Sequence, residues 1–99
     1  METRVHLPDM KPPSSITEVM VALRSKKLEP VHEKKAWGDW ITFPGNQTVV
    51  SIESMRGLSS SATIEHAEED GYEINLSIQA AFGKLGWMGS DEDGEFRLD

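Results

Sequence analysis

The sequence predicts an α+β fold, a two-layer sandwich in which an antiparallel sheet of three to four strands carries two helices on one face, in the order α-β-β-β-α-β. Three observations predict it: two stretches with apolar residues at helical spacing, a central run of alternating apolar and polar residues, and turn signals between the alternating segments. The chain of 99 residues has no internal repeat and is long enough for one hydrophobic core. We therefore expect a single domain over residues 14–99.

The first 13 residues are predicted to form an extended or partly disordered arm. Pro8, Pro12 and Pro13 disfavour a regular element, because proline fixes φ and withholds a backbone donor. The arm lacks the continuous apolar core of a signal peptide, and no stretch of the chain approaches the roughly 20 apolar residues of a membrane-spanning helix. These features predict a cytoplasmic protein that does not bind membranes.

A first helix is predicted over about residues 16–28. Ser15 and Glu18 have the S-x-x-E spacing of a capping box, in which each side chain accepts a hydrogen bond from the other residue's backbone. Apolar residues then recur at the spacing of one buried helical face. Pro30 is expected to end the helix, because it forces the preceding residue out of the helical region.

A three-stranded antiparallel meander is predicted over residues 37–43, 48–54 and 58–66. The first segment is aromatic and β-branched, and the next two alternate between apolar and polar residues. Turn signals separate them, at residues 44–46 and at Arg56 with Gly57.

A second helix is predicted over about residues 74–85, where apolar residues recur at helical spacing after the charged segment 68–71. Gly86 is placed to end this helix in the left-handed conformation. An acidic turn over residues 90–94 then leads into a short strand at 95–98.

Composition removes several classes of function. The chain has 17 acidic and 10 basic residues, and its net charge of −7 repels nucleic acid backbones. It has no cysteine, so it has neither disulfides nor a cysteine nucleophile. Its three histidines, His6, His32 and His66, lack the spacing of a local metal motif. We expect no metal, no cofactor and no nucleic acid.

Tryptophan supplies the sharpest indication of a binding surface. Trp37 and Trp40 have opposite parity along one predicted strand, so one of the two rings is expected on the sheet face away from the helices, unless a bulge at Gly38 changes the alternation. Together with Val49 and Met55, the outward ring would form an apolar patch on a face otherwise built of Ser, Thr and Glu. We expect this patch to be an interaction surface.

The leading interpretation is a non-enzymatic binding or regulatory module that contacts a protein partner, or a second copy in a homodimer, through a sheet face or edge. One alternative is a small enzyme or small-ligand binder with a pocket between the first helix and the sheet, for which the candidate residues are Arg56, Glu65, His66 and Trp87. A further alternative is an acidic inhibitor or antitoxin-like protein that binds a basic partner through clustered carboxylates, at Glu65, Glu68, Glu69, Asp70 and within residues 91–95. The sequence leaves these three open.

Overall fold

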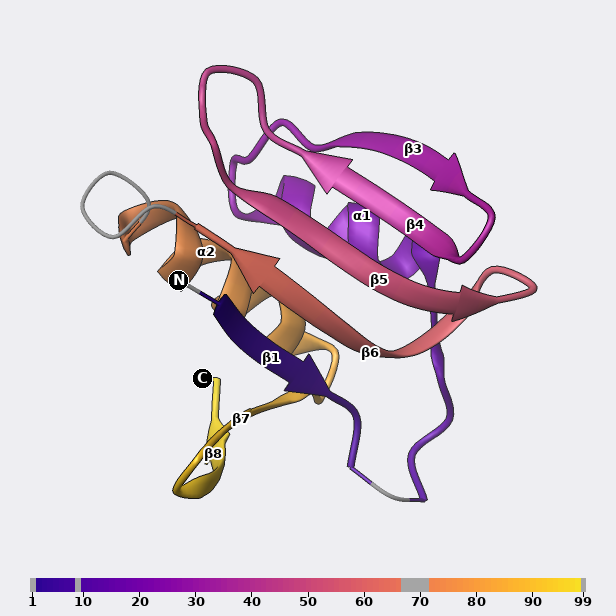
Figure 1. Ribbon diagram of the computed structural model, residues 1–99, viewed down its shortest axis with the longest axis vertical. Coiled ribbons are helices and arrows are strands. Elements are labelled where there is room, and N and C mark those ends of the chain that lie inside the picture. The colour runs from indigo at the N-terminus through magenta and orange to yellow at the C-terminus, as the bar shows by residue number, and fades with distance from the viewer. Residues whose placement is uncertain (1, 9, 67–71, 99) are drawn as a thin grey trace.

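In a computed structural model, which describes residues 2–8, 10–66 and 72–98, the chain forms one antiparallel sheet and two helices (Figure 1). In chain order the elements are β1 (Glu2–His6), β2 (Ser14–Ser15), α1 (Ile16–Ser25), β3 (Val31–Lys35), β4 (Gly38–Thr42), β5 (Val49–Met55), β6 (Leu58–Glu65), α2 (Tyr72–Lys84), β7 (Met88–Asp91) and β8 (Gly94–Arg97). The order across the sheet is β3-β4-β5-β6-β1-β7-β8, and the short β2 pairs with the start of β6.

The predicted sheet of three to four strands is therefore wrong, because the sheet of the described residues has eight strands and dominates the fold. The predicted meander is present as β4, β5 and β6, and the predicted C-terminal strand is β8. The sequence interpretation did not include β1, β2, β3 or β7. The order α-β-β-β-α-β is likewise wrong, because strands precede α1 and a further strand separates α2 from β8.

β1 lies inside the sheet between β6 and β7, within the segment predicted to be an arm. Val5 is buried and faces Ala62 of β6, while Arg4 and His6 point to the other face. This strand alternates like any half-buried strand, but the prolines that follow it obscured the pattern. Its partners are also far along the chain, and single-sequence periodicity does not reveal such pairings.

β3 is an edge strand that pairs with β4, and none of its five residues is buried. It therefore carries no apolar alternation, which is the signal that predicts strands. Lysine is common on edge strands because its charge opposes pairing with another chain, and β3 contains Lys34 and Lys35.

α1 begins with the predicted capping box, in which Ser15 Oγ accepts from the Glu18 amide and Glu18 Oε1 accepts from the Ser15 amide. It ends earlier than predicted, at Ser25, because the amides of Lys26 and Lys27 turn back to carbonyls of the last turn. Lys27 then adopts a positive φ of 63°. The helix has ended before Pro30 is reached.

α2 ends as predicted, with Gly86 in the left-handed region at φ 85°. The Gly86 amide donates to the Gly83 carbonyl at 3.0 Å and the Trp87 amide to the Phe82 carbonyl at 3.1 Å, which is a Schellman arrangement. Neither described helix has the length and apolar composition needed to cross a membrane.

Both helices lie behind the sheet in the view of Figure 1, and the core fills the space between them and the strands. Its members are apolar residues from both layers: Val5, Leu7, Ile16, Val19, Met20, Ala22, Leu23, Ile41, Phe43, Val50, Ile52, Ala62, Ile64, Ile78, Ala81, Phe82 and Trp87. Because the core occupies one side of the sheet, the side chains of the other side are left without a helix over them.

Candidate functional site: the open face of the sheet

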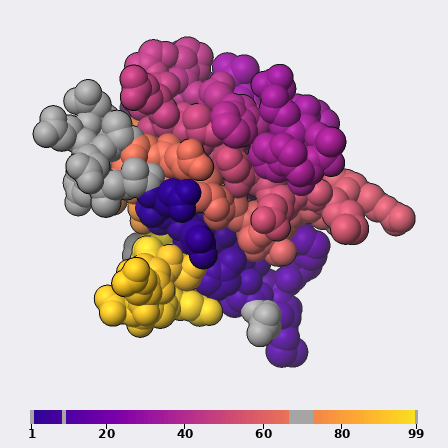
Figure 2. Space-filling model, viewed as in Figure 1, coloured from indigo at the N-terminus to yellow at the C-terminus, as the bar shows by residue number. Residues whose placement is uncertain are grey.

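The sheet face away from the helices is called the open face here, and Figure 2 views the molecule from this side. Cross-strand register places several rows of side chains on it, two of them across its centre. One row runs through Trp40, Ser51, Thr63, Arg4 and Ser90, and the other through Glu53, Ser61, His6 and Met88. Small hydroxyl side chains fill the centre of both rows. The face is therefore polar and shallow at its centre.

A hollow of about 460 Å³ lies on the open face. Its lining combines the hydroxyls of the two rows with charged side chains and one indole: Arg4, Val5, His6, Trp37, Ser51, Glu53, Ser61, Ala62, Thr63 and Ser90. The lining comes from β1, β5, β6, β7 and the turn before β4. Distant segments of the chain thus meet at one site.

Trp37 lines this hollow, and Trp40 of β4 packs against the Trp37 ring. Their ring centroids are 6.2 Å apart with planes at 77°, an edge-to-face pair. Trp40 lies in β4 with its ring on the open face. Trp37 lies in the turn before β4, so the alternation of side chains along the strand does not decide its direction. The predicted outward indole is Trp40, and the turn brings Trp37 to the same side.

A second, larger hollow, the hairpin groove, lies beside the turn between β5 and β6 and has a volume of about 900 Å³. Its apolar lining comes from Pro13, Trp37, Met55 and Leu58. Met55 and Leu58 face each other across the two strands, and Glu53 and Ser61 belong to both hollows. The hairpin groove is thus continuous with the open face.

Of the four residues predicted as an interaction surface, the structure brings three together. Trp37 and Trp40 form the indole pair, and Met55 lines the hairpin groove with Trp37. Val49 is on the open face but at the far end of β5, six residues and about 20 Å from Met55. Its cross-strand neighbours there are Thr42 and Glu65.

Several carboxylates lie at the end of the open face that carries Val49, where β1 pairs with β6. Glu68, Glu69 and Asp70 of the predicted acidic cluster lie outside the described residues. Glu2 pairs directly with Glu65 across the two strands, and both side chains are exposed. A hollow of about 460 Å³ beside them is lined by Glu2, Arg4, Ser90, Asp91 and Glu92. Neither Glu2 nor Glu65 forms an ion pair with another described residue. Like charges directly opposite one another on adjacent strands are unfavourable.

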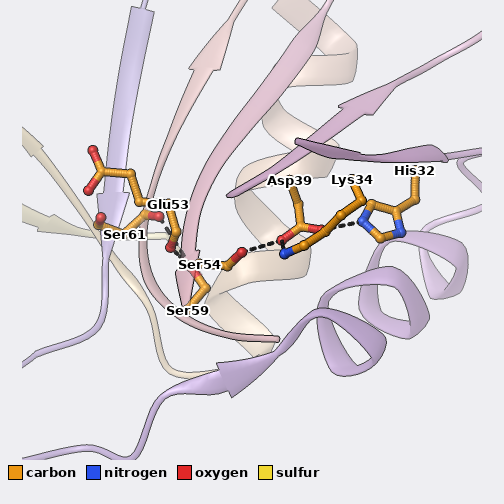
Figure 3. Close-up of polar contacts among 7 residues, drawn as sticks. All are labelled: His32, Lys34, Asp39, Glu53, Ser54, Ser59 and Ser61. Carbon is orange, nitrogen blue, oxygen red and sulfur yellow. Dashed lines mark hydrogen bonds and ion pairs between the residues drawn. The ribbon is translucent and has the colours of Figure 1, made fainter. Parts of the chain in front are cut away.

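A buried carboxylate stands on the other side of β4, where sequence reasoning named no site. Asp39 is 1% exposed and accepts hydrogen bonds from Ser54 on β5 and from the His32 ring on β3 (Figure 3). Lys34 Nζ lies 3.6 Å from the same carboxylate. Burial raises the pKa of Asp39, but the hydrogen bonds from Ser54 and His32 and the charges of Lys34 and His32 outweigh it and hold this pKa below its usual value.

This cluster joins three strands and does not resemble an activated nucleophile. The serine hydroxyl and the imidazole both bond the carboxylate, whereas a serine nucleophile needs the imidazole as its own base. The carboxylate is also closed to solvent. The cluster fixes the edge strand β3 to β4 and β5, and so holds the segment that carries the two tryptophans.

The four residues considered for a pocket between the first helix and the sheet lie apart. Arg56 is at the β5–β6 turn and Glu65 at the opposite end of β6. His66 is buried directly after β6. Trp87 is 2% exposed in the core, where its Nε1 donates to Ser14 Oγ at 2.9 Å and its ring packs on Phe82.

Sequence reasoning missed Asp39, Arg4 and His6. For Asp39 a signal existed, because it shares strand parity with the buried Ile41 and Phe43. A carboxylate at a buried strand position needs hydrogen-bond or ion-pair partners, so its presence predicts a polar cluster around it. Arg4 and His6 are placed by the pairing of β1, for which the sequence gives no local signal.

No family model, no curated protein and no solved structure matches this chain.

Proposed function

We propose that this protein is a binding module that holds a basic protein partner on the open face of its sheet. The observation that carries the proposal is the asymmetry of the two sheet faces. One face packs against both helices, while the other presents the indole pair of Trp37 and Trp40, of which Trp37 lines a hollow with hydroxyl and charged side chains.

The chemistry of the face suits a protein surface. Tryptophan is enriched at interface hot spots, because its ring buries a large apolar area and keeps one hydrogen-bond donor. Ser51, Ser61 and Thr63 each offer a donor and an acceptor around the hollow. An apolar anchor surrounded by polar groups is the usual composition of a protein interface.

The charge of the face favours a basic partner. The whole chain carries −7, and the like-charged pair Glu2 and Glu65 stands at one end of the face, where neither carboxylate forms an ion pair with another described residue and Arg4 is the cation in the adjoining hollow. A lysine or arginine placed between these carboxylates would relieve their repulsion. Opposite potentials also accelerate association and make it sensitive to salt.

The geometry gives less support to an enzyme. The described hollows lie on the open face, beside the β5–β6 turn and next to the carboxylates, and the buried Asp39 carboxylate is closed to a substrate. Trp87 and His66, two residues considered for a pocket, are buried.

The test compares affinity-tagged variants in native extracts of the cells that make the protein. Trp40→Ser removes the indole on the open face, and Glu65→Lys reverses a charge there. Val21→Ser removes an exposed apolar side chain from α1, on the other side of the sheet, and Glu29→Lys makes the same charge change between α1 and β3. The retained proteins are then identified and their isoelectric points compared.

We expect the wild type and both control variants to retain a protein with a basic isoelectric point. Added salt should release this protein. Trp40→Ser and Glu65→Lys should lose most of it. Equal retention by all variants, or a partner that is acidic, would contradict the proposal.

A further inference from the structure

The turn between β5 and β6 is a two-residue hairpin turn that projects from the body of the protein (Figure 2). Met55 and Leu58 are the last cross-strand pair, and Arg56 and Gly57 form the turn with φ of 57° and 77°. Two successive positive φ angles are typical of the type I′ turn, in which Asn-Gly is strongly preferred.

Arginine is an unfavourable choice for the first turn position. Left-handed backbone brings Cβ close to the following carbonyl oxygen, and Asn tolerates this conformation better than longer side chains do. The chain nevertheless places Arg56 there, exposed at the tip. Backbone strain at an exposed residue indicates that its side chain has a function.

Apolar side chains are also exposed around the tip. Met55 is 78% exposed, Leu58 46% and Trp37 49%, and all three line the hairpin groove. Projection and groove adjoin each other on one molecule. A surface that contains both an apolar projecting turn and an apolar groove is complementary to a second copy of itself.

The charges of the tip are complementary as well. Arg56 stands at the turn and Glu53 lines the groove two residues before Met55. Both are exposed, and neither forms an ion pair with another described residue. In a two-fold arrangement, the Arg56 of each copy would meet the Glu53 of the other, so one contact would be made twice.

We propose that a second copy of this chain occupies the hairpin groove, forming a two-fold dimer in which each tip places Met55 and Leu58 against the partner's Trp37. Reciprocal pairs between Arg56 and Glu53 fix its register and offset the repulsion between two chains of −7 each. The tip is small compared with the surface that a stable dimer buries, so the dimer is a weak one that dissociates on dilution.

This inference goes beyond the proposed function and does not rest on it. Trp37 and Glu53 line both hollows, but Trp40 and Glu65, on which the test of the basic partner depends, stay outside the contact at the tip. Failure of the dimer test therefore leaves the basic-partner proposal standing, and the reverse also holds.

The test is the mass in solution, measured by sedimentation equilibrium over a wide range of protein concentration. The variants are Met55→Ser, Glu53→Arg, Arg56→Glu and the double variant Glu53→Arg/Arg56→Glu. Leu76→Ser is the matched control, because Leu76 is 48% exposed on α2. All the substituted side chains are exposed, so the variants should fold, and circular dichroism checks this.

The wild type and Leu76→Ser should show a monomer–dimer equilibrium. Each single charge reversal, and Met55→Ser, should raise the dissociation constant about tenfold or more. The double variant should restore it to within about threefold of the wild type, because the pair is rebuilt with reversed signs. A wild type that stays monomeric would overturn the proposal, as would a dimer that persists in every variant or a double variant no better than the single ones.

Discussion

The backbone carbonyl of Ile52 on β5 lies directly over Gly38 on β4, and a Cβ added to Gly38 would stand 2.0 Å from that oxygen. Real side chains do not tolerate this distance, so β4 and β5 approach each other here only because position 38 is glycine. The close approach sets the start of β4, and with it the turn that carries Trp37 next to Trp40.

Gly38→Ala should therefore lower the free energy of unfolding by about 2 kcal/mol or more, because either the strand or the turn must move. Urea denaturation measures the loss. Gly45→Ala is the control: it also has a positive φ, but its Cβ meets nothing within 4 Å, so it should cost only about 1 kcal/mol. Equal losses in the two variants would mean that the contact with Ile52 does not constrain the sheet.

Asp39→Asn should remove a contribution to stability that depends on pH. The pKa of Asp39 is lowered in the folded protein from its usual 3.8, so the carboxylate stabilises the fold above that value, and its contribution is lost as pH falls through the lowered pKa. We expect the wild type to exceed the variant by about 1–3 kcal/mol near pH 6, with the difference shrinking towards pH 3. A difference that grows on acidification would contradict this assignment.

The hydrogen bond from Trp87 Nε1 to Ser14 Oγ, at 2.9 Å, joins α2's end to β2 inside the core. Ser14→Ala should cost about 1–3 kcal/mol, because it leaves a buried donor without an acceptor. In a double-mutant cycle with Trp87→Phe, the second substitution should cost less once the first has been made, with a coupling of about 1 kcal/mol. Additive losses in chemical denaturation would show that the bond contributes nothing.

Arg56→Asn should stabilise the monomer by about 0.5–1 kcal/mol, because Asn adopts the left-handed conformation of the turn more easily than Arg does. Thermal unfolding of a dilute sample, below the range of self-association, measures this gain. The same variant should dimerise more weakly. A variant that is less stable as a monomer would show that Arg56 has a structural role within its own chain.

The elements that the sequence predicted are those with a local cause. The capping box of Ser15 and Glu18 starts α1, Gly86 ends α2, and Arg56 with Gly57 turns β5 into β6. Each depends on neighbouring residues and on backbone preferences that proline, glycine and short polar side chains impose.

The elements that it missed have distant causes. β1 is a central strand because β6 and β7 supply its partners, and β3 is a strand because β4 pairs with it. Alternation does not identify an edge strand without buried residues, such as β3. The indole pair shows both effects: parity places Trp40 on the open face, while the close approach at Gly38 places Trp37 beside it.

The most direct test of the open face as a binding surface is hydroxyl-radical footprinting of Trp40 in native cell extract and in dilute purified protein. We expect Trp40 to be protected in the extract, exposed after purification and exposed again in the extract at high salt. The exposed Val21 on α1 should be modified equally in all three samples, and the buried Trp87 should be protected in all of them. Equal modification of Trp40 in the extract and in the purified protein would contradict the claim that a partner covers this face.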